Sequence, residues 1–208
     1  MWFAGAMGTA VGLLLAAGSG SRMGGPKALV RGAGGEPWAR AAARSLHEGG
    51  CPQVVAVLGA AGGEAEALLA DLPWVSVVHA QAWAVGMGSS LRAGLDALEP
   101  TPSDCAVVGL VDTPDVGAEV VCRVLAAVGT SPTALGRAAY GGVPGHPVVL
   151  GREHWQGVGA SASGDRGARD YLAAHPPRLV ECGDLATGAD VDAPSDAVGG
   201  TPRDRGLE

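Results

Sequence analysis

The sequence has few aromatic residues, and its cysteines are far apart. Aromatic residues make up 4% of the 208 residues, so a core has to be built mainly from Ala, Val and Leu within the 47% that are hydrophobic. Cys51, Cys105, Cys122 and Cys182 form no CxxC pair, which argues against a clustered metal or redox motif. We expect reduced, mostly buried thiols in a cytoplasmic protein.

Positive charge is also scarce. No Lys or Arg precedes Arg22, so the apolar N-terminus lacks the charged start of a secretory signal peptide. No later run approaches the ~20 apolar residues of a membrane-spanning helix. The formal net charge of −7 argues against a nucleic-acid binder that works through a basic surface. We therefore expect neither a membrane nor a nucleic-acid partner, although a local site can still bind an anion.

Short apolar runs alternate with amphipathic segments through the first part of the chain. Buried parallel strands are expected at 11–17, 54–58, 75–79 and 105–111. Helices are expected at 37–48, 63–72, 89–98 and 116–128. This order predicts an α/β fold, a Rossmann-like doubly wound sheet that is mainly parallel. Ligands of such sheets bind beyond the carboxyl ends of the strands.

The pattern changes after Gly129. Residues 133–150 predict a β-hairpin insertion that turns at Gly141-Gly142. A long helix is expected at 166–175 and a last strand at 178–182.

These elements predict a single domain over residues 1–197. Its nucleotide-binding half is expected at about 11–128 and its acceptor-binding half at about 129–197. The polar tail at 198–208 is expected to be disordered.

A glycine-rich turn follows the first predicted strand in LLLAAGSGSRMGGPKALV, residues 13–30. Such a turn exposes several backbone N–H groups, which bind an anion when they converge. The lysine is not followed by Ser or Thr, and the glycines are too widely spaced for a dinucleotide fingerprint. The remaining interpretation is a triphosphate loop with the basic pair Arg22 and Lys27. Lys27 is the chain's only lysine, and a compact point charge suits a phosphate.

Acidic residues mark two further places. Asp112 ends the fourth predicted strand in LVDTPDV, where a carboxylate can hold Mg²⁺ together with substrate phosphates. The alternative is a helix cap, a role that suits Asp115 better. In VDAPSD near the end, Asp192 is a candidate second metal ligand, whereas solvated charge is the alternative for this segment.

Two loops carry candidate binding residues. GMGSSL, residues 86–91, places Ser89 and Ser90 at a helix start, where they could bind a ribose or phosphate or where Ser89 could simply cap the helix. GVPGHPVVL places His146 between two glycine/proline breaks, as a substrate contact or as an ordinary turn residue.

Several blocks together resemble the MobA-like nucleotidyltransferases. The first is LAAGSGSRMGGPK, and the others, in chain order, are WAVGMGSSLRAGL, VDTPDV, GVPGHPVVLGREHW, SGDRGARDYL and DVDAPSDA. They extend over residues 11–197, and the later blocks resemble the branch that contains molybdenum cofactor cytidylyltransferase.

The resemblance implies a nucleotide-diphospho-sugar transferase-like fold and transfer of CMP from CTP to the terminal phosphate of the molybdopterin-bound molybdenum cofactor, with release of pyrophosphate. It places Mg²⁺ on Asp112 and the cations that contact the nucleotide phosphates on Arg22 and Lys27. Ala17 favours cytosine, since the guanylyl branch tends to have LAGG. The implied nucleotide-binding residues are Ala16, Ala17, Gly18, Ser19, Gly20, Ser21, Arg22, Met23, Gly24, Lys27, Gly86, Gly88, Ser89 and Ser90, and Gly145 and His146 would face the acceptor.

The chain departs from the family pattern in places. Gln81 stands near the position of a usual asparagine, Val111 replaces a glycine before Asp112, and residues 193–196 read Ala-Pro-Ser-Asp. Two alternatives follow: a guanylyl or other nucleotidyltransferase with a different phosphate acceptor such as a sugar phosphate, or a non-catalytic chaperone that holds a molybdenum cofactor. Either could serve a client molybdoenzyme.

Overall fold

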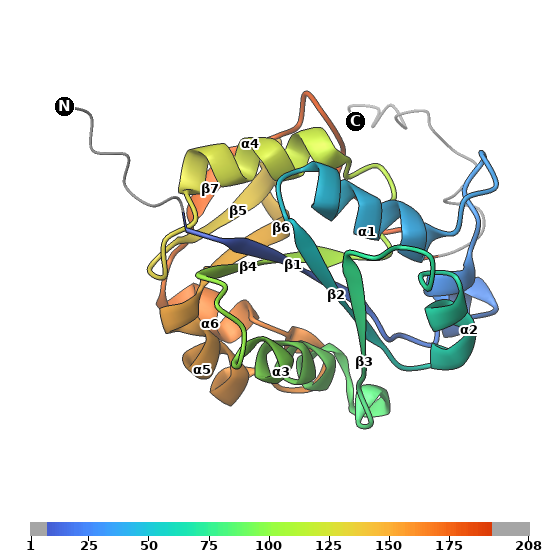
Figure 1. Cartoon of the computed structure of the whole chain (residues 1–208). Helices are drawn as coiled ribbons and strands as arrows, with labels where there is room; N and C mark the ends of the chain where they lie inside the picture. The colour runs from blue at the N-terminus through green and yellow to red at the C-terminus, as the bar shows by residue number, and fades with distance from the viewer. Residues whose placement is uncertain (1–7, 193–208) are drawn as a thin grey trace, which may run out of the picture.

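Seven strands form one sheet in the order β3-β2-β1-β4-β6-β5-β7 in the computed structural model, which describes residues 8–192 (Figure 1). The strands are β1 Ala10–Ala16, β2 Gln53–Leu58, β3 Val75–His79, β4 Cys105–Leu110, β5 Leu135–Tyr140, β6 Val143–Gly151 and β7 Arg178–Glu181. The first four are mutually parallel, β6 is antiparallel to β4 and β5, and β7 is parallel to β5. The predicted mainly parallel α/β sheet is confirmed.

Helices cover both faces of this sheet. The α-helices are α1 Trp38–Glu48, α2 Gly62–Ala67, α3 Met87–Leu98, α4 Ala118–Val128, α5 Arg152–Ser161 and α6 Arg169–Ala174. The 3-10 turns are η1 Ser21–Met23, η2 Lys27–Leu29, η3 Trp83–Val85 and η4 Gly164–Arg166. Figure 1 shows α1 and α4 on one face and α3, α5 and α6 on the other. None of the helices among residues 8–192 is long and apolar enough to cross a membrane.

The central strand β1 shows why the sequence folds this way. All seven of its residues are buried, because helices pack on both faces. Leu14 belongs to the hydrophobic cluster beneath α1 and α4, whereas Leu13 and Leu15 belong to the cluster beneath α3 and α5. A continuous apolar run is the sequence pattern of a parallel strand that is buried on both sides.

Three sequence predictions need correction. The expected helix at 166–175 is split into η4 and the shorter α6, and α5 was not predicted at all. Helix α3 begins at Met87 rather than at Ser89, and its N-cap position is Gly86, with no side-chain cap. The predicted hairpin is present as β5 and β6. The tail expected to be disordered, 198–208, lies outside the described residues.

The hairpin contains an irregularity near the end of β4. Arg137 of β5 pairs with Val148 of β6, but Ala139 already pairs with Pro144. One β5 residue therefore lies opposite the three residues 145–147 of β6, which form a β-bulge. Bulges are common next to active sites, because they redirect the backbone and end the regular pairing.

Candidate functional site

A cavity of about 410 Å³ opens at the carboxyl ends of β1 and β4. Strands β2 and β3 extend the sheet on one side of β1, and β4 lies on its other side, so the cavity lies at the point where the strand order reverses. Such a point is the usual ligand site of an open α/β sheet. The cavity is lined by Leu15, Ala17, Gly18, Ser19, Gly20, Ser21, Arg22, Lys27, Trp83, Ala84, Gly86, Met87, Ser90, Leu110, Val111, Asp112, Asp165 and Asp192.

The loop after β1 depends on glycine for its shape. Gly20 has φ 57°, and an added Cβ would lie 2.0 Å from the carbonyl oxygen of Gly25. The carbonyl of Gly20 accepts hydrogen bonds from the N–H groups of Met23 and Gly25, at 2.8 and 3.3 Å. Within residues 8–192, the N–H groups of Gly18 and Ser19 have no acceptor. Both residues line the cavity, so these donors are available to an anion.

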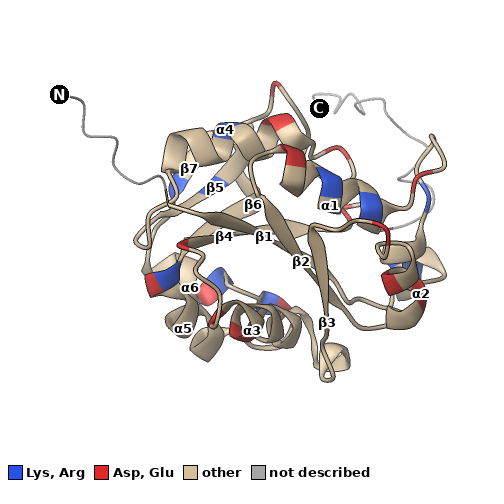
Figure 2. Ribbon diagram, in the orientation of Figure 1, with Lys and Arg blue, Asp and Glu red and all other residues tan. Residues whose placement is uncertain are grey.

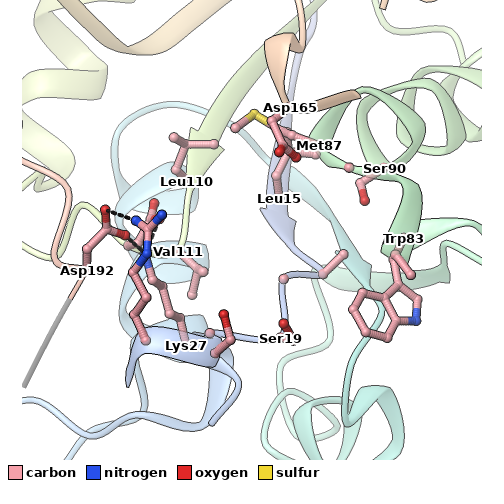
Figure 3. Close-up of a pocket in the computed structure, with 18 residues that line it drawn as sticks. Leu15, Ser19, Lys27, Trp83, Met87, Ser90, Leu110, Val111, Asp165 and Asp192 are labelled. Atoms are coloured by element: carbon pink, nitrogen blue, oxygen red, sulfur yellow. Dashed lines mark hydrogen bonds and ion pairs between the residues drawn. The ribbon is translucent and has the colours of Figure 1, made fainter. Parts of the chain in front are cut away.

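Lys27 is the centre of an ion cluster at one end of the cavity (Figure 3). Its Nζ atom lies 2.8 Å from Oδ2 of Asp112 and 2.6 Å from Oδ1 of Asp192. Burial lowers the pKa of Lys27, but the hydrogen bonds to the two carboxylates outweigh burial and raise it above its usual value. The hydrogen bond from Lys27 lowers the pKa of Asp192. The ammonium is therefore charged at neutral pH, and so is the Asp192 carboxylate.

The segment after β7 is tied to the end of β4 by hydrogen bonds. The N–H of Val191 donates to the carbonyl of Asp112 at 2.9 Å. The N–H and Oγ1 of Thr187 donate to Oδ2 of Asp115, at 2.7 and 2.6 Å. Asp115 therefore anchors this segment and is not the N-cap of α4, which is Gly117. These bonds hold Asp192 beside Asp112, although 80 residues separate them in sequence.

The carboxylates of Asp112 and Asp192 fit a magnesium ion by their chemistry and placement. Both oxygens lie within hydrogen-bond distance of the same Nζ atom, so one cation already lies between them. Mg²⁺ is held by one or two carboxylates plus substrate phosphates and water. No group of three or more His, Cys, Asp or Glu side chains is arranged for a metal within residues 8–192. Burial raises the pKa of nearby Asp190, and the charge of Asp112 adds to this shift.

The opposite end of the cavity is apolar. Figure 3 shows Trp83 on the far side from Lys27 and Asp192, with Met87 and Leu15 between. Met87 and Trp83 come from the segment after β3, whose backbone contacts the segment before α6: a Cβ on Gly86 would lie 2.5 Å from the carbonyl carbon of Gly164. A charged end and an apolar end suit a ligand with a phosphate group and a ring.

The structure brings only part of the predicted site into the cavity. Among the predicted residues, the cavity lining includes Ala17, Gly18, Ser19, Gly20, Ser21, Arg22, Lys27, Gly86, Ser90, Asp112 and Asp192. It does not include Ala16, Met23, Gly24, Gly88, Ser89, Gly145 or His146.

The serines at the start of α3 have different surroundings. Ser89 donates its hydroxyl to the carbonyls of Ala82 and Gly86, at 2.6 and 2.7 Å. Its hydroxyl therefore holds the loop before α3 instead of facing the cavity. Ser90 is buried and lines the cavity.

Sequence reasoning missed Trp83, Met87 and Asp165 as site residues. Trp83 and Met87 lie in the block WAVGMGSSLRAGL and Asp165 lies in SGDRGARDYL, but none of the three forms a catalytic or binding motif of its own. Their role at the cavity arises from the approach of η4 to the start of α3, and a local pattern contains no such information. The only sequence signal for these three residues was the polar side chain of Asp165 directly after a glycine.

A family comparison covers most of the chain. Residues 12–179 match the family described as "MobA-like NTP transferase domain". Nicotine blue oxidoreductase of Paenarthrobacter nicotinovorans is 39% identical over an alignment of 191 residues that covers 87% of this chain and 91% of that protein. The name of this relative describes an oxidoreductase rather than a transferase.

Solved structures share the fold. Rv0371c from Mycobacterium tuberculosis H37Rv has 26% identity and a TM-score of 0.73, covering 91% of this chain and 96% of that chain. A structure of that protein in complex with manganese has 24% identity and a TM-score of 0.68, over 90% and 95% of the chains. A nucleotidyl transferase from a Methanothermobacter species has 22% identity and a TM-score of 0.73, over 92% and 94%. The chain therefore has the nucleotide-diphospho-sugar transferase fold, which it shares with these structures.

Proposed function

Since this chain belongs to the family of MobA-like NTP transferases, we propose that it transfers CMP from CTP to the terminal phosphate of molybdenum-loaded molybdopterin and releases pyrophosphate. The observation that carries the proposal is the convergence of Lys27, Asp112 and Asp192 at one end of a cavity beside a glycine loop. These residues come from three separate segments, and each has a place in the chemistry of joining two phosphates.

The reaction needs no strong base, because the attacking group is already a phosphate oxygen. That oxygen attacks the α-phosphorus of CTP, the bond between the α-phosphorus and the bridging oxygen to the β-phosphate breaks, and pyrophosphate leaves. The obstacle is to bring two polyanions together. The free N–H groups of the loop and the ammonium of Lys27 offset that charge, and Arg22, which is mostly exposed at the mouth of the cavity, adds a second cation.

Asp112 and Asp192 would hold the divalent cation, Mg²⁺ in this proposal. When bound, this ion supplies a Lewis acid that screens the phosphate charge and stabilises the leaving pyrophosphate. The manganese complex of the fold neighbour Rv0371c supports a divalent cation. Because Lys27 lies between the two carboxylates, its ammonium has to move toward the phosphates before both carboxylates can share a metal ion.

CTP is proposed over GTP on the basis of Ala17, which lines the cavity. The apolar end with Trp83 and Met87 provides contact area for the ring of the nucleotide or of the acceptor. The test is pyrophosphate release with Mg²⁺ and molybdenum-loaded molybdopterin, measured separately with CTP, GTP, ATP and UTP. Release with CTP alone supports the proposal, whereas release mainly with GTP would move the chain to the guanylyl branch and contradict the argument from Ala17.

A second candidate rests on the 39% identity with nicotine blue oxidoreductase. In that case the chain would catalyse a redox reaction of a conjugated ring compound, with the apolar end of the cavity holding the ring. The test is anaerobic incubation of the protein with nicotine blue and a two-electron donor, with the loss of visible absorbance as the readout. Decolourisation of nicotine blue, together with no pyrophosphate release from any of the four nucleotides, would favour the redox function over nucleotidyl transfer.

A further inference from the structure

The sheet face that carries the cavity continues onto a basic cluster, which consists of the cations Arg137 and Arg169 and the neutral ring of His146. Leu15 and Leu110 line the cavity and belong to the hydrophobic cluster beneath α3 and α5. Val148 of β6 belongs to the same cluster. Arg137 pairs directly with Val148, so it lies on this face as well.

The neighbouring glycine gives independent evidence for this placement. A Cβ added at Gly136 would lie 2.3 Å from a methyl group of Val128 in α4, so Gly136 faces the opposite side of the sheet. Because successive residues of a strand face opposite sides, Arg137 faces α3, α5 and α6. Figure 2 shows no Lys, Arg, Asp or Glu on β1 to β4, and the other such strand residues of this sheet, Arg178 and Glu181, lie on the edge strand β7.

The β-bulge at residues 145–147 brings His146 next to Arg137. Pairing of β4 with β6 ends at Val108 opposite Val148, whereas pairing of β4 with β1 continues to Leu110. Beyond that point, the bulge at 145–147 redirects β6. Its carbonyls are held by side chains: Nε of Arg137 donates to the carbonyl of Gly145 at 3.0 Å, and the hydroxyl of Tyr140 donates to that of His146 at 2.6 Å.

The cluster lacks a compensating carboxylate. Neither Arg137 nor Arg169 forms an ion pair within residues 8–192. Arg137 is half-buried, and burial together with the charge of Arg169 lowers its pKa. Burial and Arg137 also lower the pKa of His146, to about 4, so this ring is neutral at pH 7. A half-buried guanidinium without a carboxylate partner is costly, and an anion bound to Arg137 would lower that cost.

The distance to the ion cluster determines which anion can bind. Arg137 lies two strands from β4 in the sheet order, which corresponds to roughly 10 Å across the sheet. Its row on β4 is Val108, four residues before Asp112, so the backbone of Arg137 is more than roughly 10 Å from the ion cluster. A phosphate that reacts beside Lys27 cannot also contact Arg137. We propose that Arg137, assisted by Arg169 and His146, binds a second anionic group of the acceptor, located at least roughly 10 Å from the reacting phosphate. This inference rests on the proposed function, in which that second group is the oxo-molybdenum end of the cofactor.

The main experiment compares KM values of wild type and Arg137→Gln for molybdenum-loaded and molybdenum-free molybdopterin. For the loaded acceptor, KM should rise roughly 10- to 100-fold, the effect of losing a charge-assisted hydrogen bond. The KM for CTP and for the molybdenum-free acceptor should change less than about twofold. Arg137→Lys should lie between wild type and Arg137→Gln, because it keeps the charge and loses the planar donor geometry.

Two further variants guard against a simple folding defect. Arg169 is exposed, so Arg169→Gln should fold normally and raise the same KM by roughly 3- to 10-fold. Arg44→Gln removes the same charge from α1, on the opposite face of the sheet, where Arg44 pairs with Glu36, and it should leave every KM unchanged. An unchanged KM for the loaded acceptor in folded Arg137→Gln overturns the inference, and so does an equal rise for CTP.

If the wild-type protein releases no pyrophosphate, a binding measurement decides the inference separately. Molybdate is titrated into the protein while the ring C–H resonances of His146 are followed by NMR. A saturable shift in wild type that is lost in Arg137→Gln supports the anion site and leaves only the proposed reaction wrong. The same response in both proteins, or none in wild type, overturns the anion site.

Discussion

Replacing Lys27 with alanine should separate the catalytic role of its ammonium from its role in the resting site. The side chain is 14% exposed, and its Nζ lies 2.8 and 2.6 Å from the carboxylates of Asp112 and Asp192. In the reaction, the same charge would contact the phosphates of the nucleotide. Loss of one preorganised charge contact costs about 2.7–4 kcal/mol in the transition state, so turnover should fall by roughly 10²- to 10³-fold.

The resting site should change in the opposite direction. In the wild-type protein, a divalent cation has to displace the ammonium of Lys27 from both carboxylates, and this competition weakens metal binding when no nucleotide is present. In Lys27→Ala, Asp112 and Asp192 have no such competitor. Affinity for Mg²⁺ or Mn²⁺ without nucleotide should therefore rise, by roughly 3- to 10-fold, even though turnover falls.

The assays are pyrophosphate release at saturating CTP and acceptor, and calorimetric titration of Mn²⁺ without nucleotide. Arg31→Ala is the control, because Arg31 is exposed, donates to the carbonyl of Gly35 and does not line the cavity. Turnover of Lys27→Ala within about threefold of wild type would refute the site assignment. Unchanged metal affinity would refute the competition between lysine and metal.

Three further predictions follow from the geometry. Asp112→Asn should lower the rate of pyrophosphate release by more than about 100-fold, because the variant loses a metal ligand. Equal rates in wild type and Asp112→Asn would show that this carboxylate does not hold the metal ion. In a urea titration, Gly20→Ala should lower the free energy of unfolding by about 1–3 kcal/mol, because Gly20 has φ 57° and the added Cβ would lie 2.0 Å from the carbonyl oxygen of Gly25. Gly25→Ala is the control and should leave the free energy of unfolding unchanged, because its added Cβ would have no atom within 4 Å. The pKa of His146 is about 4 in the folded protein, against 6.5 for an unperturbed imidazole, so unfolding takes up a proton at pH values between the two. The free energy of unfolding should therefore fall by about 1–3 kcal/mol from pH 7 to pH 4. The free energy of unfolding of His146→Asn should depend less steeply on pH over the same range.

The sequence predicted the parallel half of the fold well, because its strands carry their own signal. A strand such as β1 is apolar throughout, since helices bury both faces, and glycines end the run. Helix α5 had no comparable signal. Only Trp155 and Val158 of its ten residues are buried, and two glycines interrupt it, so neither apolar periodicity nor helix propensity distinguishes it from a loop.

The candidate site was predicted in the same uneven way. Lys27 and Asp112 each follow a strand whose carboxyl end lies at the same edge, so the topology alone brings them near each other. His146 was expected at the cavity, but it lies in the bulge outside the lining. That outcome depends on the pairing of one β5 residue with three of β6, and a one-dimensional pattern does not contain the register of an irregular hairpin.

The family itself does not decide between transfer and redox chemistry, because a fold supports more than one activity. What differs between the two is the need for the charged end of the cavity. A nucleotidyl transfer requires a cation beside the phosphates and carboxylates for a metal, and both are present around Lys27. Redox chemistry on a ring needs the apolar end near Trp83 and gains nothing from an ammonium held by two carboxylates. Conservative replacement of the residues of this ion cluster should therefore abolish transfer while leaving ring reduction intact. The presence of the cluster in this chain favours transfer.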